Sequence, residues 1–173
     1  RFTISTSAVS DTHYYKIHNV QNSSYYVSTD ATPDKVTYAS TETNNMVWFL
    51  KEAGSDTWFK YYYIVNPEAN KYMYYSGTAI DGSDQTNAVC VRTYDSGNED
   101  RYQFVVVQAA RGDGASRVEC YAIIPKPLTG NLWTSCSIGP KGTIRDGLNM
   151  GIITSRGAIS RSEERRVGKE CRS

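Results

Sequence analysis

The chain alternates short apolar runs with clusters of polar turn residues. The central example is residues 58–75, WFKYYYIVNPEANKYMYY, which predicts a strand, a short polar turn and a second strand. Related stretches precede it at residues 14–28 and follow it at residues 120–135. No segment repeats apolar residues at a helical period over a window of about 11 residues. The pattern therefore predicts an all-β protein.

Matching positions in the three stretches indicate an internal repeat. The first strand of each stretch contains Tyr-x-Ile, and Ile17, Ile64 and Ile123 recur at spacings of roughly 50 residues, which is typical of repeat architectures. We therefore expect these isoleucines to be equivalent and to point into one core. The second strands of the three pairs are predicted at residues 25–28, 71–75 and 132–135.

Further short strands complete the first two of three expected units of about four strands each. They are predicted at residues 36–39, 46–52, 88–92 and 102–108. The units are expected to span residues 12–57, 58–116 and 117–157, after a lead-in at residues 1–11. In the lead-in, Phe2 and Ile4 alternate as in a strand, which is either the last strand of a preceding unit or a terminal strand that closes the fold.

The third unit is expected to be incomplete. Its fourth strand should begin between residues 154 and 163, where the sequence becomes charged and lacks an aromatic residue. Residues 161–173, RSEERRVGKECRS, resemble a recurrent cloning or adapter read-through peptide. Residues 158–173 are therefore expected to be a foreign or disordered tail, and the alternative is a native basic tail. Because the chain begins with Arg1 and has no signal peptide, we expect a fragment or a processed product.

Composition excludes some classes of partner. The net charge is +1, and 39% of residues are hydrophobic and 21% charged, as in a globular protein that does not bind nucleic acid or anionic membranes. No apolar run approaches the roughly 20 residues that span a bilayer, so membrane insertion is not expected. Tyrosine is abundant, with 14 copies, and it suits both strands and half-hydrated binding faces.

The repeated motifs resemble those of the ricin B-type lectin family. The resemblance rests on YYKIHN at residues 14–19, YYYIVN at residues 61–66, and the fourth-strand positions Met46-Val47-Trp48 and Tyr102-Gln103-Phe104, where that family has Gln-x-Trp. It implies a β-trefoil with three pseudo-repeats. It also implies a non-catalytic carbohydrate-binding module, one domain of a larger secreted or cell-surface protein that recognises a glycan or glycoprotein.

The resemblance also suggests candidate binding residues. Where the family has a sugar-binding aspartate, this chain has Ser28, Tyr74 and Thr134, so that contact is missing. The most complete candidate site lies in the second unit and consists of Asp81, Asp84 and Asn87, with Tyr74 or Tyr94 as the stacking ring. A secondary candidate in the third unit consists of Trp133, Asp146 and Asn149. The alternative interpretation is that these residues only form turns and core.

Other chemistry is not indicated by the sequence. Two histidines, His13 and His18, without a third ligand do not specify a metal site, and no nucleophile–base pair or opposed carboxylates suggest an enzyme. No cofactor is expected. Cys120 and Cys136 flank a predicted hairpin and could pair if the protein is secreted. A protein-binding trefoil of the inhibitor or adhesion type is the alternative function.

Overall fold

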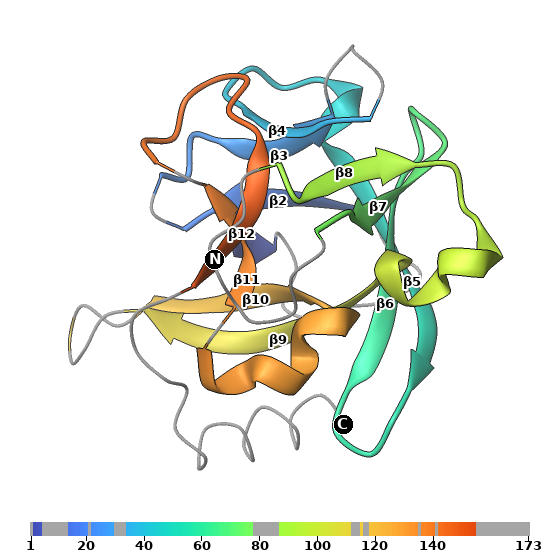
Figure 1. Ribbon diagram of the computed structural model, residues 1–173. Coiled ribbons are helices and arrows are strands. Elements are labelled where there is room, and N and C mark those ends of the chain that lie inside the picture. Colours follow the sequence, from blue (N-terminus) through green and yellow to red (C-terminus); the bar gives the residue numbers. More distant parts are fainter. Residues whose placement is uncertain are drawn as a thin grey trace.

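The structure, a computed structural model, describes residues 2–4, 14–20, 22–29, 34–77, 87–111, 115, 118–134, 136–140 and 142–154. Within these ranges the chain consists of short antiparallel β-strands and a few 3₁₀ segments (Figure 1). The all-β prediction is therefore confirmed. Residues 155–173, which include the proposed foreign tail, lie outside the described residues.

Six strands form a closed ring in which each strand pairs antiparallel with two neighbours. In ring order they are β1 (Phe2–Ile4), β2 (Tyr14–Asn19), β5 (Val47–Ser55), β6 (Lys60–Asn66), β9 (Gln103–Arg111) and β10 (Val118–Pro125), and β10 returns to β1. Alternate residues point into the ring and away from it, as the period of two requires. The ring thus has an inner face and an outer face.

Three further strand pairs lie outside the ring. They are β3 (Tyr26–Thr29) with β4 (Val36–Ala39), β7 (Lys71–Tyr75) with β8 (Val89–Arg92), and β11 (Cys136–Pro140) with β12 (Met150–Thr154). Isolated bridges join Lys35 to Cys90 and Thr37 to Asn149, and β8 also contacts β12. The second strands of all three pairs therefore meet at one end of the molecule (Figure 1).

The pairing register recurs three times around the ring. The partners on neighbouring ring strands are Tyr15 with Trp48, Tyr62 with Phe104, and Tyr121 with Phe2. Two residues further along each strand, Ile17 faces Ile4, Ile64 faces Leu50, and Ile123 faces Val106. Ile17, Ile64 and Ile123 are fully buried in one hydrophobic cluster. The prediction that these isoleucines share a core is confirmed.

The closing strand of the ring comes from the N-terminus. β1 pairs with both β10 and β2, so it occupies the ring position for which the sequence offered no strand near residue 154. Of the two possibilities left open for Phe2–Ile4, a terminal strand that closes the fold is the one observed. The ring is closed by residues far from the third unit in sequence.

The predicted strand at residues 132–135 is wrong. Residues 132–134 belong to the 3₁₀ segment η4 (Lys126–Thr134), and the first outer strand of the third unit is β11 instead. Pro127 cannot donate to a strand ladder, and the Thr129 hydroxyl donates to the Lys126 carbonyl at 2.7 Å, which favours a turn. The strand begins at Cys136 and is buried on both faces from Cys136 to Gly139, with Ile138 fully buried.

The main core contains the single fully buried tryptophan of the described residues, Trp48. Its indole Nε1 donates to the Val27 carbonyl at 2.9 Å. This bond satisfies the N–H, which is the only polar group of the buried indole side chain. Cys120 and Cys136 are both buried and are not joined by a disulfide, so the pairing considered from the sequence is not observed.

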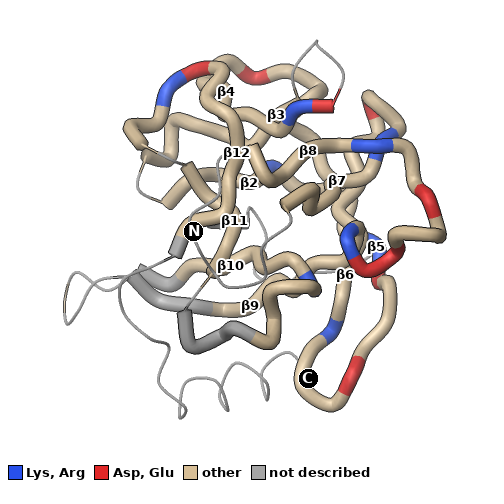
Figure 2. Tube along the Cα trace, viewed as in Figure 1, with Lys and Arg blue, Asp and Glu red and all other residues tan. Residues whose placement is uncertain are grey.

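Charged residues occur mainly in turns and at strand ends, with both signs interspersed over the described part of the chain (Figure 2). Exposed ion pairs join Lys16 to Glu42, Lys60 to Glu52, and Lys71 to Asp34. Pairs at such exposure contribute about 0–1 kcal/mol each, so they do not hold the fold together.

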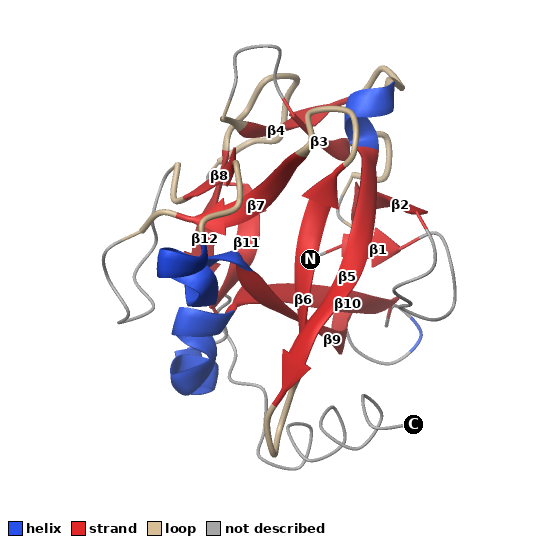
Figure 3. Ribbon diagram, turned by 90° about the vertical axis from the view of Figure 1, so that its right-hand side faces the viewer, coloured by secondary structure: helices blue, strands red, loops and turns tan. Residues whose placement is uncertain are grey.

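Two 3₁₀ segments cover part of the outer face. The segment η2 (Ser96–Tyr102) contacts β7 and β9, and η4 contacts β9, β10 and β11. The two segments also contact each other. Figure 3 shows helical segments stacked beside the strands at the left and another helix at the upper right. A third short segment, η1 (Asn44–Met46), precedes β5. The candidate site is built where η2 and η4 meet the outer face of β6.

Candidate functional site

A cluster of five tyrosines lies on the outer face under η2. We call Tyr63, Tyr72, Tyr74, Tyr94 and Tyr102 the tyrosine cluster. The ring centroids of Tyr72 and Tyr94 are 5.2 Å apart, as are those of Tyr94 and Tyr102, and those of Tyr74 and Tyr102 are 4.7 Å apart. Tilted and edge-on contacts at these distances are favourable, because the ring edge is positive and the face negative.

The cluster is buried on one side and open on the other. Tyr63, Tyr74 and Tyr102 are 9%, 6% and 2% exposed, whereas Tyr94 is 38% exposed and Tyr72 is half-buried. The Tyr102 hydroxyl donates to the Thr93 carbonyl at 2.8 Å, which fixes the chain just before η2. Tyr94 is therefore an aromatic ring that solvent can reach but that its neighbours hold in place.

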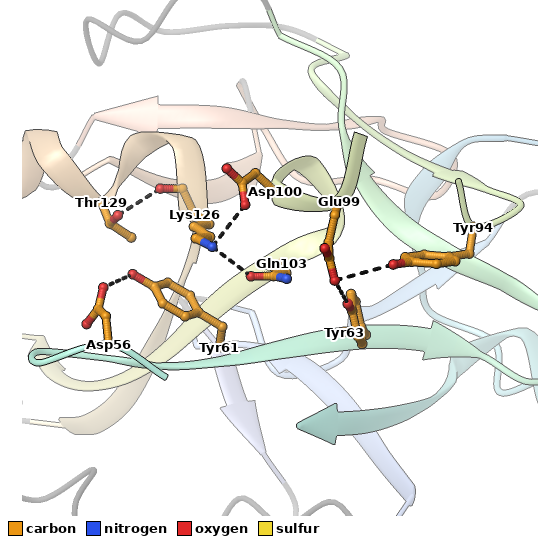
Figure 4. Close-up of polar contacts among 9 residues, drawn as sticks. All are labelled: Asp56, Tyr61, Tyr63, Tyr94, Glu99, Asp100, Gln103, Lys126 and Thr129. Atoms are coloured by element: carbon orange, nitrogen blue, oxygen red, sulfur yellow. Dashed lines mark hydrogen bonds and ion pairs between the residues drawn. The ribbon is translucent and has the colours of Figure 1, made fainter. Parts of the chain in front are cut away.

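Glu99 of η2 places a carboxylate beside this open ring (Figure 4). The Tyr63 hydroxyl donates to Glu99 Oε1 at 2.6 Å, and the Tyr94 hydroxyl lies 3.4 Å from the same oxygen. Glu99 Oε2 accepts no hydrogen bond from the described residues. One carboxylate oxygen is thus held by tyrosine, while the other can accept from a ligand.

The hydrogen bonds around Glu99 depend on which neighbouring groups carry a proton. Burial and then the hydrogen bond to Glu99 raise the pKa of Tyr63 well above its ordinary value, so its hydroxyl stays a donor at neutral pH. At the start of η2, Asp95 accepts from the Gly97 N–H at 2.9 Å and from the Asn98 amide at 2.9 Å, and these bonds lower the pKa of Asp95. Asp95 therefore caps the segment that carries Glu99.

A second polar group, the Lys126 network, lies further along β6 (Figure 4). Lys126 Nζ is 2.9 Å from Asp100 Oδ1 and 3.1 Å from Gln103 Oε1, and it lies 4.8 Å from the centroid of the Tyr61 ring. The Tyr61 hydroxyl donates to Asp56. Burial and then this bond raise the pKa of Tyr61 to about 12. The network joins η2, η4 and the β5–β6 turn, with its charges already paired.

The β5–β6 turn is held by Asp56 and exposes a tryptophan. Asp56 Oδ1 accepts from the backbone N–H groups of Trp58 at 2.7 Å and Phe59 at 2.8 Å. Burial would raise the pKa of Asp56, but the hydrogen bonds from Tyr61, Trp58 and Phe59 outweigh it and lower that pKa. The Trp58 side chain is 65% exposed at the tip of this ordered turn.

Of the residues predicted for the second-unit site, the structure describes Asn87, Tyr74 and Tyr94. Asp81 and Asp84 lie outside the described residues. Asn87 is exposed with a φ of 59°, in the left-handed region that asparagine tolerates better than most residues. The Tyr94 side chain is 38% exposed, and a ring that stacks on a sugar must be exposed.

Of the two rings predicted as alternatives for stacking, Tyr74 is the covered one. The ring is 6% exposed, with the Arg92 guanidinium 4.3 Å from its centroid and Tyr102 packed against it. A sugar cannot reach this ring because η2 and the Arg92 side chain cover it.

The secondary candidate in the third unit is largely used by the fold itself. Both Asp146 oxygens accept from Ser40, from its N–H at 2.7 Å and from its hydroxyl at 2.9 Å. Asn149 forms an isolated bridge with Thr37. Trp133 lies in η4, and its side chain is outside the described ones. Asp146 thus links the β11–β12 loop to the end of β4.

Glu99 and Lys126 were not predicted as site residues. Glu99 is 36 positions from Tyr63, its main partner, and Lys126 is 26 positions from Asp100. A capped turn at Asp95 was readable from the sequence, but it does not indicate that η2 folds back onto β6 and β7.

Comparison with known proteins does not assign the chain to a family. No protein-family model matches the chain, and no curated protein is significantly similar to it. In the described ranges, no group of three or more His, Cys, Asp or Glu side chains is placed to hold a metal ion. Nor does any helix there have the length and apolar character needed to cross a membrane.

Proposed function

We propose that the chain is a β-trefoil that serves as a non-catalytic carbohydrate-binding module. The trefoil assignment is supported by the three matching registers around the ring, such as Ile17 opposite Ile4 and Ile64 opposite Leu50. It is also supported by the three outer strand pairs that meet at one end. The four strands of each unit then contribute two to the ring and two to an outer pair, with β1 completing the third unit.

Carbohydrate binding is supported by one observation above all: the exposed Tyr94 ring lies beside the Glu99 carboxylate. A sugar presents hydroxyl groups on its rim and C–H groups on its face. It therefore needs a flat aromatic surface together with an acceptor of fixed position. Tyr94 provides the surface, and Glu99 Oε2 provides the acceptor. This pair replaces Tyr74, the ring that the fold covers.

The absence of catalysis is part of the proposal. A glycosidase needs two carboxyl groups on opposite sides of the scissile bond. The groups that contact Glu99 are tyrosine hydroxyls, Tyr63 and Tyr94. The partner is proposed to be a glycan or glycoprotein outside the cell, bound together with neighbouring domains of a larger chain, because one shallow site gives about millimolar affinity and several sites give avidity.

Titration with simple sugars, followed by NMR, tests this function. We expect shifts around Tyr94 and Glu99, and at least tenfold weaker binding in Tyr94→Ala and Glu99→Gln, which corresponds to about 1.4 kcal/mol. Asp81→Ala tests one of the two predicted acids that lie outside the described residues. Trp58→Ala is the matched control because it removes an exposed aromatic ring elsewhere. Binding that survives both Tyr94→Ala and Glu99→Gln, or no binding of any sugar, would contradict the proposal.

The exposed Trp58 supports a second candidate function, a protein-binding trefoil. Tryptophan is enriched at the energetic centres of protein interfaces, and a turn ordered in advance loses little entropy on binding. Asp56 provides that order by accepting from Trp58 and Phe59. A protein that binds the wild-type chain and Tyr94→Ala equally, but not Trp58→Ala, would favour this alternative.

A further inference from the structure

Outward-facing side chains form a continuous row across five strands. Tyr14 on β2 pairs with Phe49 on β5, Phe49 with Val65 on β6, Val65 with Tyr72 on β7, and Tyr72 with Arg92 on β8. All five positions lie on the outer face, because the alternate positions of these strands are buried. We call Tyr14, Phe49, Val65 and Tyr72 the outer row, with Arg92 beyond its end.

The outer row is partly exposed and continuous with the proposed sugar site. Tyr14 is 63% exposed, and Phe49, Val65 and Tyr72 are half-buried. The Tyr14 and Phe49 ring centroids are 5.6 Å apart. At the other end, the Tyr72 ring lies 5.2 Å from Tyr94. Three steps between neighbouring strands give the row a length of about 14 Å, longer than a single sugar ring.

The charges around the row favour a neutral ligand. Lys16, on the same face as Tyr14, is paired with Glu42 at 2.9 Å, and Arg92 lies over the Tyr74 ring. Lys51, two residues beyond Phe49, and Glu99 carry opposite charges. The row therefore has no single-sign field that would attract a polyanion.

The size of the row argues against a protein partner. A stable protein interface buries about 800 Å² on each partner, from some 20–30 residues. The outer row has four side chains, of which only Tyr14 is mostly exposed. A narrow aromatic strip of this kind fits an extended chain of flat rings better than a second protein surface.

We propose that the outer row binds a linear, neutral oligosaccharide that extends from the Tyr94–Glu99 site to Tyr14. This inference rests on the proposed function and adds its ligand class: a chain of several sugars rather than one terminal sugar. Successive rings place their C–H faces on Tyr94, Tyr72, the Val65–Phe49 surface and Tyr14. Each further contact slows dissociation, so affinity increases with chain length until the row ends.

Calorimetric titration of the full chain with neutral oligosaccharides, from the monosaccharide to the hexasaccharide, tests this inference. For the wild type we expect affinity to increase about tenfold or more along the series. Tyr14→Ala should remove the last part of this increase and leave monosaccharide binding unchanged. Trp58→Ala is the control: its side chain is 65% exposed, close to the 63% of Tyr14, but it lies off the row. It should bind like the wild type.

The outcomes separate the inference from the proposed function. Monosaccharide binding with no dependence on chain length overturns the inference and leaves the function standing. Equal losses in Tyr14→Ala and Trp58→Ala also overturn it, as does strong weakening by salt, which would indicate a polyanionic ligand. No binding at any length contradicts the proposed function itself.

Discussion

The segments η2 and η4 cover neighbouring parts of the same outer face with different chemistry. η4 buries Leu128 completely in the main core. η2 buries Tyr102 at 2% exposure but leaves the adjoining Tyr94 at 38%. A leucine has no polar group left after burial, whereas a tyrosine buries its ring and still needs a partner for its hydroxyl.

Because of this difference, the surface under η4 is closed, whereas the surface under η2 keeps polar groups that can contact a ligand. Under η2 the hydroxyls of Tyr63 and Tyr102 are held by Glu99 and by the Thr93 carbonyl. These bonds make the tyrosine cluster sensitive to protonation and keep a carboxylate at the surface. The described part of η4 seals the sheet with Leu128, and its charged residue, Lys126, is already paired with Asp100.

The largest expected effect on stability comes from a substitution in η4. Leu128→Ala should lower the free energy of unfolding by about 2–5 kcal/mol, because it leaves a cavity in a fully buried position. Tyr94→Ala is the counterpart on the open side and should cost much less. Urea unfolding of both variants measures this. Equal losses would show that η2 and η4 contribute alike to the core.

Alkaline pH should weaken the η2 side. The pKa values of Tyr63 and Tyr102 are raised from 10.0, mainly by burial, so folding favours their protonated forms. Their contribution is complete below pH 10 and is lost as the pH rises from 10 through the raised values. Urea unfolding as a function of pH measures it, with tyrosinate absorbance reporting the titration.

The control for the alkaline effect is Tyr63→Phe, which keeps the ring and removes the titrating hydroxyl. This variant should lose less stability than the wild type above pH 10. An identical decline in both proteins would mean that other groups cause the effect.

The contact between the two segments should matter little. Lys126 and Asp100 are 32% and 71% exposed at their side chains, and exposed pairs contribute about 0–1 kcal/mol. A double-mutant cycle of Lys126→Met and Asp100→Asn measures the coupling. A coupling energy above about 2 kcal/mol would show that η2 and η4 act as one unit rather than two coverings.

The smallest effect is expected from the C-terminal residues 161–173. Deletion of residues 161–173 should change the free energy of unfolding by less than about 0.5 kcal/mol, as for surface changes without packing. Thermal unfolding of the full and shortened chains checks this. A drop of several degrees would mean that the tail supplies a strand to the fold.

The sequence determined the strands themselves, since alternation with period two is a local property. The strands Tyr14–Asn19, Val36–Ala39 and Lys71–Tyr75 have the bounds that the pattern predicts. The burial of Ile17 and Ile64 also followed from their place in Tyr-x-Ile. Each of these expectations depends only on neighbours within one strand or on the repeat.

Tertiary structure decided which residues meet. Tyr74 and Tyr94 both lie in aromatic stretches, but only the way η2 folds back over β7 makes one covered and the other open. Asp146 was predicted to bind sugar, but both of its carboxylate oxygens accept hydrogen bonds from Ser40, which is 106 positions away. Pairing across such separations depends on the closure of the whole ring, and no local pattern of apolar and polar residues encodes it.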